Sequence, residues 1–286
     1  MLMSKKRKLV SGIIFAVLLV ALLVGIVLTG PGGEEEPIKE VMKDAVLHEH
    51  GKVSLFGLIN VNPGLISAFT VTGIFLVFGL VVRIFFIPRF TRIPGKFQML
   101  LESAVGIFEN LAGSNSPHRN GFLGAYVFAA GAYIFVGTIF ELFGIQVPLT
   151  NGGVIALPAP LADINGAIAM GVMSYLIIMS GGIAGNGVKG VFLTLKDFSL
   201  PISMSFRLFG ALLSGALVTE LVYYYLAVSF VVPVLVGVMF TMLHALIQAY
   251  VLTMLVALFY GEVSETAPKK VKVKKNKKNK NIPEVE

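Results

Sequence analysis

The sequence predicts an all-α integral membrane protein with five to six transmembrane helices, on three observations. Of its 286 residues, 56% are hydrophobic and only 14% are charged, whereas a soluble domain carries about 25% charged residues. The apolar residues gather in long runs, and about 20 such residues are enough for a helix to cross a bilayer. Basic residues cluster between these runs, as they do in the cytoplasmic loops of membrane proteins.

The first apolar run covers residues 10–29 and lies between a basic cluster, Lys5–Lys8, and an acidic run, Glu34–Glu36. This asymmetry predicts a cytoplasmic N-terminus. We expect residues 1–29 to form an uncleaved anchor, because no A-x-A-like cleavage site ends the run. A cleaved signal peptide is the alternative. The polar residues 30–62 are expected to form an external loop.

Five further apolar runs are expected to span the membrane. They cover residues 64–87, 121–145, 161–182, 201–226 and 231–260. Six crossings that begin in the cytoplasm return every basic cluster to that side, so both termini are expected to be cytoplasmic. Residues 63–262 would then form one membrane domain. The basic tail, residues 263–286, has too little apolar content to fold alone.

The segment after the second crossing is polar on one side and apolar on the other. Residues 97–113 carry Glu102 and Glu109 among apolar residues at helical spacing. This pattern predicts an amphipathic helix lying at the membrane surface. A connector helix packed on other helices is the alternative.

Arg207 is the most informative residue within an apolar run. A charge at the centre of a membrane helix costs about 2.5–3.5 kcal/mol on insertion scales, so it usually faces a partner or water. Most residues within about 60° of Arg207 on an ideal helix are small. They are Ser203, Gly210, Ala211, Ser214 and Val218. Small residues let another helix approach closely, so this face is expected to meet a partner while presenting a permanent positive charge.

The last run carries a polar stripe. Thr241, His244, Ala245 and Gln248 follow the i, i+3, i+4, i+7 spacing of one helix face. The stripe is expected to line a water-filled path or to meet the Arg207 helix. His244 could pass protons or make an interhelical hydrogen bond, and Gln248 is expected to hold Arg207 by hydrogen bonding.

Two further positions place carboxylates within apolar runs. Glu220 follows Arg207 by 13 residues, which is about 20 Å along an ideal helix and roughly 140° round it. These two residues therefore cannot pair on one helix. Asp163 and Asn165 lie at the start of the run 161–182 and are further candidates for an ion path.

Three segments carry a resemblance to one family. They are SFRLFG at 205–210, HALIQAYVLTMLVALFYGE at 244–262 and LADINGAIAMGVMSYL at 161–176. They resemble the two signature helices and the earlier Asp-x-Asn segment of subunit a of F-type ATP synthases. The resemblance covers residues 64 to 262 and leaves out the N-terminal run and the basic tail.

The resemblance implies an ion-translocating stator subunit. Arg207 would be the family's stator arginine and Gln248 the glutamine beside it. The last two helices would be long and tilted against a ring of c subunits, which carries ions between two half-channels. The b-subunit stalk, the rest of the F1F0 synthase and the lipid of the cell membrane would be its partners. Such a subunit is not itself an enzyme, and no cofactor is implied.

Three positions depart from the family pattern. Ala211 stands where members commonly have Asn, and Ala216 and Thr241 stand where members often pair an acid with His or Glu. Glu220 and His244 lie about one turn away and are the candidate substitutes. We expect protons to be the transported ion, with sodium as the alternative.

Two other function classes are less well supported. A stand-alone secondary transporter or channel would need its own counter-charge for Arg207 and usually an internal repeat, and neither is visible. The sequence has no H-E-x-x-H, G-x-S-x-G or Walker A motif for a membrane enzyme. Cysteine is absent, so thiolate metal sites are excluded. The net charge of +7 comes largely from the basic clusters near the two ends of the chain, which flank apolar runs. This position favours contact with anionic lipid over binding of nucleic acid.

Overall fold

The computed structural model describes residues 53–55, 58–118, 121–148, 154–224 and 232–265, together with residues 16, 17, 20, 21 and 24. Apart from those five positions, the predicted anchor over residues 10–29 lies outside the described residues. So do most of the expected external loop and almost all of the basic tail.

Within the described residues, five helices are long and apolar enough to cross a membrane. The spans are Pro63–Arg89, Gly121–Phe143, Ile164–Asn186, Ser199–Val218 and Val234–Ser264. They match five of the six runs that the sequence predicts to be membrane-spanning, and the all-α class is confirmed.

The elements follow one another in a simple order. Helix α3 (Pro63–Val81) continues through a π-helical turn (Val82–Phe86) and a 3-10 turn (Ile87–Arg89). Next come α4 (Lys96–Asn115), α5 (Gly121–Phe140) with a 3-10 turn (Glu141–Phe143), and α6 (Ile164–Asn186). The last helices are α7 (Val188–Leu195), α8 (Ser199–Tyr224) and α9 (Val232–Ser264). Two short antiparallel hairpins pair β1 (Val53–Leu55) with β2 (Leu58–Val61), and β3 (Gln146–Pro148) with β4 (Val154–Ala156).

Helix α6 shows why some predicted boundaries were wrong. It begins at Ile164 and not at residue 161, because Asp163 is its N-cap and accepts a hydrogen bond from the backbone N–H of Asn165 at 3.1 Å. It ends at Asn186, before Gly187 with its φ of +60°. Helix α7 then occupies a stretch that was expected to be a loop.

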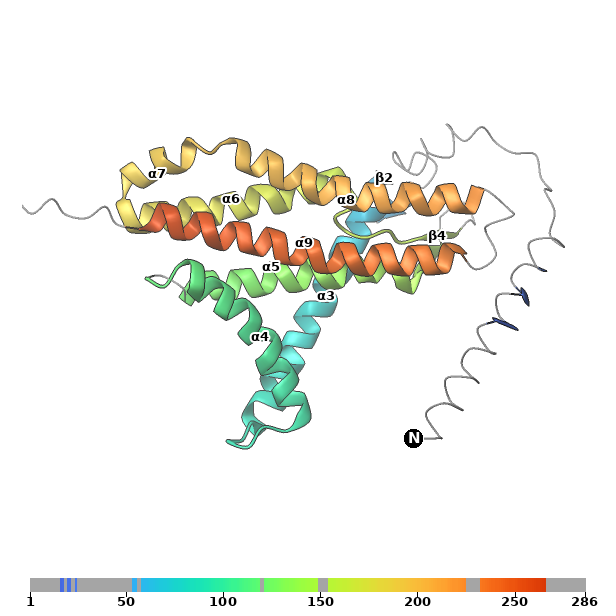
Figure 1. Cartoon of the computed structure of the whole chain (residues 1–286), viewed down its shortest axis with the longest axis horizontal. Helices are drawn as coiled ribbons and strands as arrows, with labels where there is room; N and C mark the ends of the chain where they lie inside the picture. Colours follow the sequence, from blue (N-terminus) through green and yellow to red (C-terminus); the bar gives the residue numbers. More distant parts are fainter. Residues whose placement is uncertain are drawn as a thin grey trace, which may run out of the picture.

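Helices α5, α6, α8 and α9 lie side by side along the long axis of the molecule, and α9 contacts the other three (Figure 1). Glycines set the close spacing. A Cβ atom added to Gly171 of α6 would lie 2.8 Å from the Pro201 carbonyl oxygen of α8. One added to Gly181 would lie 2.5 Å from the Tyr260 ring of α9. Such close backbone approach is how membrane helices gain packing energy without a hydrophobic driving force.

Helices α3 and α4 diverge from this four-helix group and meet at a tip (Figure 1). The predicted helix over residues 97–113 is present as α4. Its C-terminal half packs on α5 and α9, where Phe108 lies against Gly131 and the Asn115 carbonyl against Gly261. This packing favours the connector interpretation for that half.

The two last helices are long. Helix α9 has 33 residues, or about 50 Å, and α8 has 26 residues, or about 39 Å. The hydrocarbon core of a bilayer is about 30 Å thick. Both helices are longer than this thickness, so each either tilts within the core or extends beyond it.

Candidate functional site

Helix α8 presents two different faces. The buried inner face consists of Met204, Leu208 and Leu212. The exposed outer face consists of Ser203, Arg207, Gly210 and Ser214. A Cβ atom added to Gly210 would meet no atom within 4 Å. Arg207 therefore stands on an open surface made of small residues, and it forms no ion pair within the described part of the chain.

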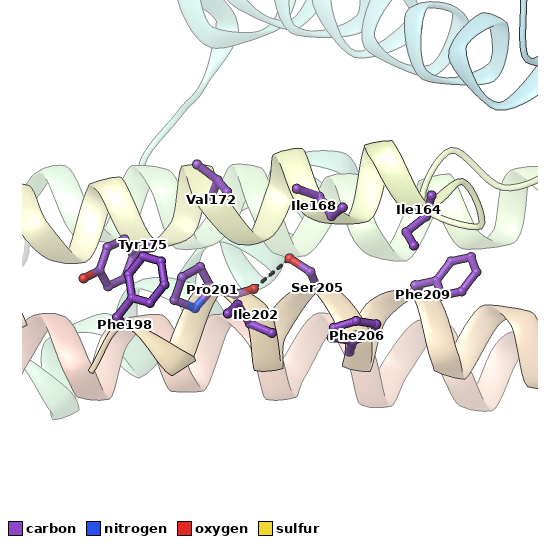
Figure 2. A pocket seen from close by; sticks show the side chains of 10 residues that line it. All are labelled: Ile164, Ile168, Val172, Tyr175, Phe198, Pro201, Ile202, Ser205, Phe206 and Phe209. Atoms are coloured by element: carbon purple, nitrogen blue, oxygen red, sulfur yellow. Dashed lines mark hydrogen bonds between the residues drawn. The ribbon is translucent and has the colours of Figure 1, made fainter. Parts of the chain in front are cut away.

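One flank of the outer face is an apolar groove between α6 and α8, of about 320 Å³. Helix α8 contributes Ile202, Phe206 and Phe209 to this groove, and α6 contributes Ile164 and Ile168 among others (Figure 2). Apart from Tyr175 and Ser205, the side chains that line the groove are apolar, and Arg207 is not among them.

The polar stripe of α9 faces α8. Ala245 and Gln248 are buried, while Thr241 and His244 are half-buried. A Cβ atom added to Gly215 of α8 would lie 3.4 Å from Nδ1 of His244. Of the two environments expected for this stripe, the structure therefore shows the contact with the Arg207 helix.

The contact between Gly215 and His244 also sets the register of these two antiparallel helices. Ala211 precedes Gly215 by four residues on α8, and Gln248 follows His244 by four residues on α9. Because the helices are antiparallel, Ala211 and Gln248 lie at the same height along the two axes. Arg207 lies one further turn back along α8, about 6 Å from Ala211 measured along the helix axis. Arg207 and Gln248 are thus close to one another along the helix axes.

The expected hydrogen bond between Arg207 and Gln248 is not made. The Oε1 atom of Gln248 is buried and has no hydrogen-bond partner among the described residues, and this oxygen is the group that a guanidinium could bond. Arg207 is exposed on α8, whereas Gln248 is buried, and the role of Gln248 beside Arg207 stays a prediction. A buried, unpaired acceptor costs about 1–3 kcal/mol.

Asp163 and Asn165 lie at the N-terminal end of α6, beside the start of α3. A Cβ atom added to Gly64 of α3 would lie 2.8 Å from the Asp163 Cβ. Their neighbour Ile164 lies opposite Phe209 of α8 (Figure 2). Measured along the axis of α8, Asp163 is therefore about one helical turn from Arg207.

Glu220 belongs to α8 by its backbone, but its side chain lies outside what the structure describes. It follows Gly215, the residue opposite His244, by five positions, which is about 7.5 Å along the axis. A pairing of Glu220 with His244 is therefore neither shown nor excluded, because it depends on a side chain outside the described residues.

Glu141 is an acidic side chain that the sequence interpretation missed. It follows α5 directly, is half-buried, and accepts a hydrogen bond from the backbone N–H of Ala159. It lies near the start of α6, because Gly137 one turn earlier contacts Pro160. The available signal was an acid at the end of the run GTIFELFG. No group of three His, Asp or Glu side chains able to hold a metal ion occurs within the described residues.

Comparison with known proteins agrees with this arrangement. A family model described as ATP synthase A chain matches residues 65–261. The chain is 25% identical over 224 residues to ATP synthase subunit a of Histophilus somni (strain 2336), covering 64% of this chain and 82% of that protein. It is 24% identical over 179 residues to ATP synthase subunit a of Cereibacter sphaeroides (strain ATCC 17025 / ATH 2.4.3), covering 58% and 69%. Since the family model matches more than half of the chain and includes both signature segments, the chain belongs to the family of F-type ATP synthase subunit a.

Proposed function

We propose that this F0 membrane subunit translocates ions as the stator, with Arg207 as the fixed positive charge that faces a rotating ring of c subunits. The exposed position of Arg207 on the small-residue face of α8 carries the proposal. A charge left facing lipid would cost about 2.5–3.5 kcal/mol. A partner surface that presents carboxylates would remove this penalty, and small residues would let that surface approach closely.

Two half-channels would open on opposite sides of the membrane and meet at Arg207. Glu141 and Asp163 lie at the end of the bundle where α3 and α6 begin, and His244 and Gln248 lie between α8 and α9, about one to two turns beyond Arg207 toward the same end. These four residues would therefore supply polar groups for the half-channel that opens at this end. The groove between α6 and α8 is lined mainly by bulky hydrophobic side chains such as Phe206 and Phe209, which would disfavour an ion path along that flank of α8.

Protons are the proposed ion. His244, Glu141 and Asp163 supply an imidazole and two carboxylates, the side chains from which proton relays within membranes are built. Sodium is the second candidate, supported by the unpaired Oε1 of Gln248 and by Thr241, which are oxygen ligands of the kind that hard cations prefer. Glu220 and Asn165 stay candidates for the same path.

The proposed partners follow from the same function. The outer face of α8, with Ser203, Gly210, Ala211 and Ser214 around Arg207, would contact the c ring. The b-subunit stalk and the remaining F1F0 chains would hold the subunit still and carry out ATP chemistry, so this chain is proposed to be non-catalytic. It would reside in the cell membrane with both termini in the cytoplasm.

ATP-driven ion uptake into vesicles that carry the assembled complex tests the proposal. Wild type, Arg207→Ala and the control Lys196→Ala would be compared, with acidification and sodium-22 entry recorded together. Lys196 is also exposed but lies just after α7, away from the outer face of α8. We expect Arg207→Ala to abolish uptake in a complex that still assembles, while Lys196→Ala keeps it.

The transported species then identifies the ion. If the Arg207→Ala complex assembles and pumps like wild type, Arg207 is structural and the stator proposal is wrong.

A further inference from the structure

The chain turns between α3 and α4 at a tip (Figure 1). Four cationic residues lie on this short stretch of chain. Arg83 lies in the π-helical turn, Arg89 in the 3-10 turn, Arg92 in the loop and Lys96 at the start of α4. All four are exposed. None of them forms an ion pair within the part of the chain that the structure describes.

Bulky apolar side chains are exposed at the same tip. Ile93 is 88% exposed and projects at the turn of the loop. Ile84, Phe85, Met99 and Leu100 are each more than half exposed. Cations and large apolar side chains interleaved in this way are typical of chain that lies at the boundary between headgroups and acyl chains.

The tip is an ordered structure with its own hydrogen bonds. The backbone N–H of Thr91 donates to Oε1 of Gln98 at 3.2 Å, and Nε2 of Gln98 donates to the Thr91 carbonyl at 3.0 Å. The rings of Phe86 and Phe97 pack 4.6 Å apart between centroids. Nε2 of Gln98 also donates to Glu102 at 2.7 Å, so this neighbouring carboxylate is already engaged.

The length of α3 places the cations at headgroup depth. Arg83 follows Pro63 by 20 residues, which is about 30 Å at 1.5 Å per residue, and Arg89 lies about 39 Å from Pro63. The hydrocarbon core is about 30 Å thick, and the bilayer with its headgroups about 40–45 Å. If α3 stands upright and begins at the opposite edge, Arg83 reaches the edge of the hydrocarbon, from which an Arg side chain can extend outward. Arg89, Arg92 and Lys96 then lie at the depth of the headgroup phosphates.

We propose that the α3–α4 tip, residues 83–100, is a binding site for anionic phospholipid headgroups. The guanidinium groups of Arg89 and Arg92 bind phosphate oxygens, each through up to two parallel hydrogen bonds. Lys96 adds a point charge, and Ile93 and Phe85 enter the acyl layer beside the bound lipid. An acidic segment of a partner protein could match the charges, but it would leave these apolar side chains in water, and lipid covers them.

Lipid selectivity of the full chain tests this site. The protein would be reconstituted in phosphatidylcholine vesicles, with spin-labelled phosphatidylglycerol or phosphatidylcholine as the probe lipid. The association constant of one lipid relative to the other would be measured at low and high salt. The test variant is R89Q/R92Q/K96Q, and R89K/R92K preserves the charge. The control K189Q/K196Q removes two exposed cations near α7, and circular dichroism checks that every variant keeps its helices.

We expect wild type to prefer phosphatidylglycerol, with a preference that weakens in high salt. The triple variant should lose about fivefold for each charge that contacts the lipid, while the control keeps most of the preference and R89K/R92K an intermediate part. Equal selectivity in wild type and the triple variant would overturn the proposal. Unchanged selectivity together with loss of complex assembly would instead assign the tip to a protein partner.

Discussion

The two faces of α8 use small residues in opposite ways. On the inner face, Ser205 lies directly against Gly171 of α6, and the two backbones are as close as side chains allow. On the outer face, Gly210 has open space around it, although it is only five residues away in the same helix. Within the bundle, the small residues lie at a contact between two helices that the structure already contains. The small residues around Arg207 lie on a surface that no described residue covers at Gly210, which fits the proposed contact with another chain.

A substitution on the outer face gives the largest expected effect of those that follow. Gly210→Leu adds a side chain where the chain itself offers no obstacle, so stability in detergent should equal that of wild type. Ion uptake by the assembled complex should fall about 100-fold, because a displacement of about 1 Å at a working interface can cost that much. Vesicle uptake and thermal unfolding measure the two halves of this prediction.

Gly73→Leu is the matched control for Gly210→Leu, since Gly73 of α3 also has nothing within 4 Å of an added Cβ atom. It should leave uptake near the wild-type level. Normal pumping by Gly210→Leu would show that no rotor contacts this face.

A substitution on the inner face should instead reduce stability. The Cβ atom of Gly171→Ala would lie 2.8 Å from the Pro201 carbonyl oxygen and closer still to Ser205 Oγ. Overpacking of this kind costs about 1–3 kcal/mol. Unfolding in mixed micelles, followed by circular dichroism, measures the loss. The double variant G171A/S205A should recover part of it, because one of the two clashing atoms is removed. A single variant as stable as wild type would contradict the tight contact between α6 and α8.

The flank of α8 that faces α9 should give the smallest effect. In Gly215→Ala the new methyl would lie 3.4 Å from Nδ1 of His244, which the ring can accommodate by a small shift. We expect uptake to fall by about two- to fivefold, equivalent to about 0.5–1 kcal/mol in barrier height. The same assay on Gly215→Ala combined with His244→Ala tests whether the loss of uptake depends on the His244 ring. If Gly215→Ala lowers uptake equally in that background, His244 is not the group that it perturbs.

The positions of the membrane-spanning helices could be predicted well from the sequence, because each such helix consists of a long apolar run. It also predicted that the face around Arg207 carries small residues, and the structure shows this face open. The role of Arg207 stays a prediction. Helical spacing determines which residues share a face. Because α8 is a continuous helix, the residues that the spacing assigns to the face of Arg207 lie on that face.

What the sequence did not reveal depends on the relations between helices. A helix wheel does not say which neighbour a face meets, so it could not predict that Arg207 is exposed while the Oε1 atom of Gln248 is buried without a hydrogen-bond partner among the described residues. The start of α6 was misjudged because Asp163 caps the helix, so the two apolar residues before it, Leu161 and Ala162, lie outside α6. Glu141 was missed because an acid at the end of an apolar run resembles an ordinary boundary residue until its half-buried position is known.

The length of α9 has a consequence for the path across the membrane. A helix of about 50 Å held within a slab of about 30 Å has its two ends displaced sideways by as much as about 40 Å. Openings at the two ends of such a helix would not lie one above the other. An ion that enters beside one end and leaves beside the other would have to be carried laterally, along an arc in the plane of the membrane. A fixed pore cannot provide that sideways transport, whereas a turning neighbour can.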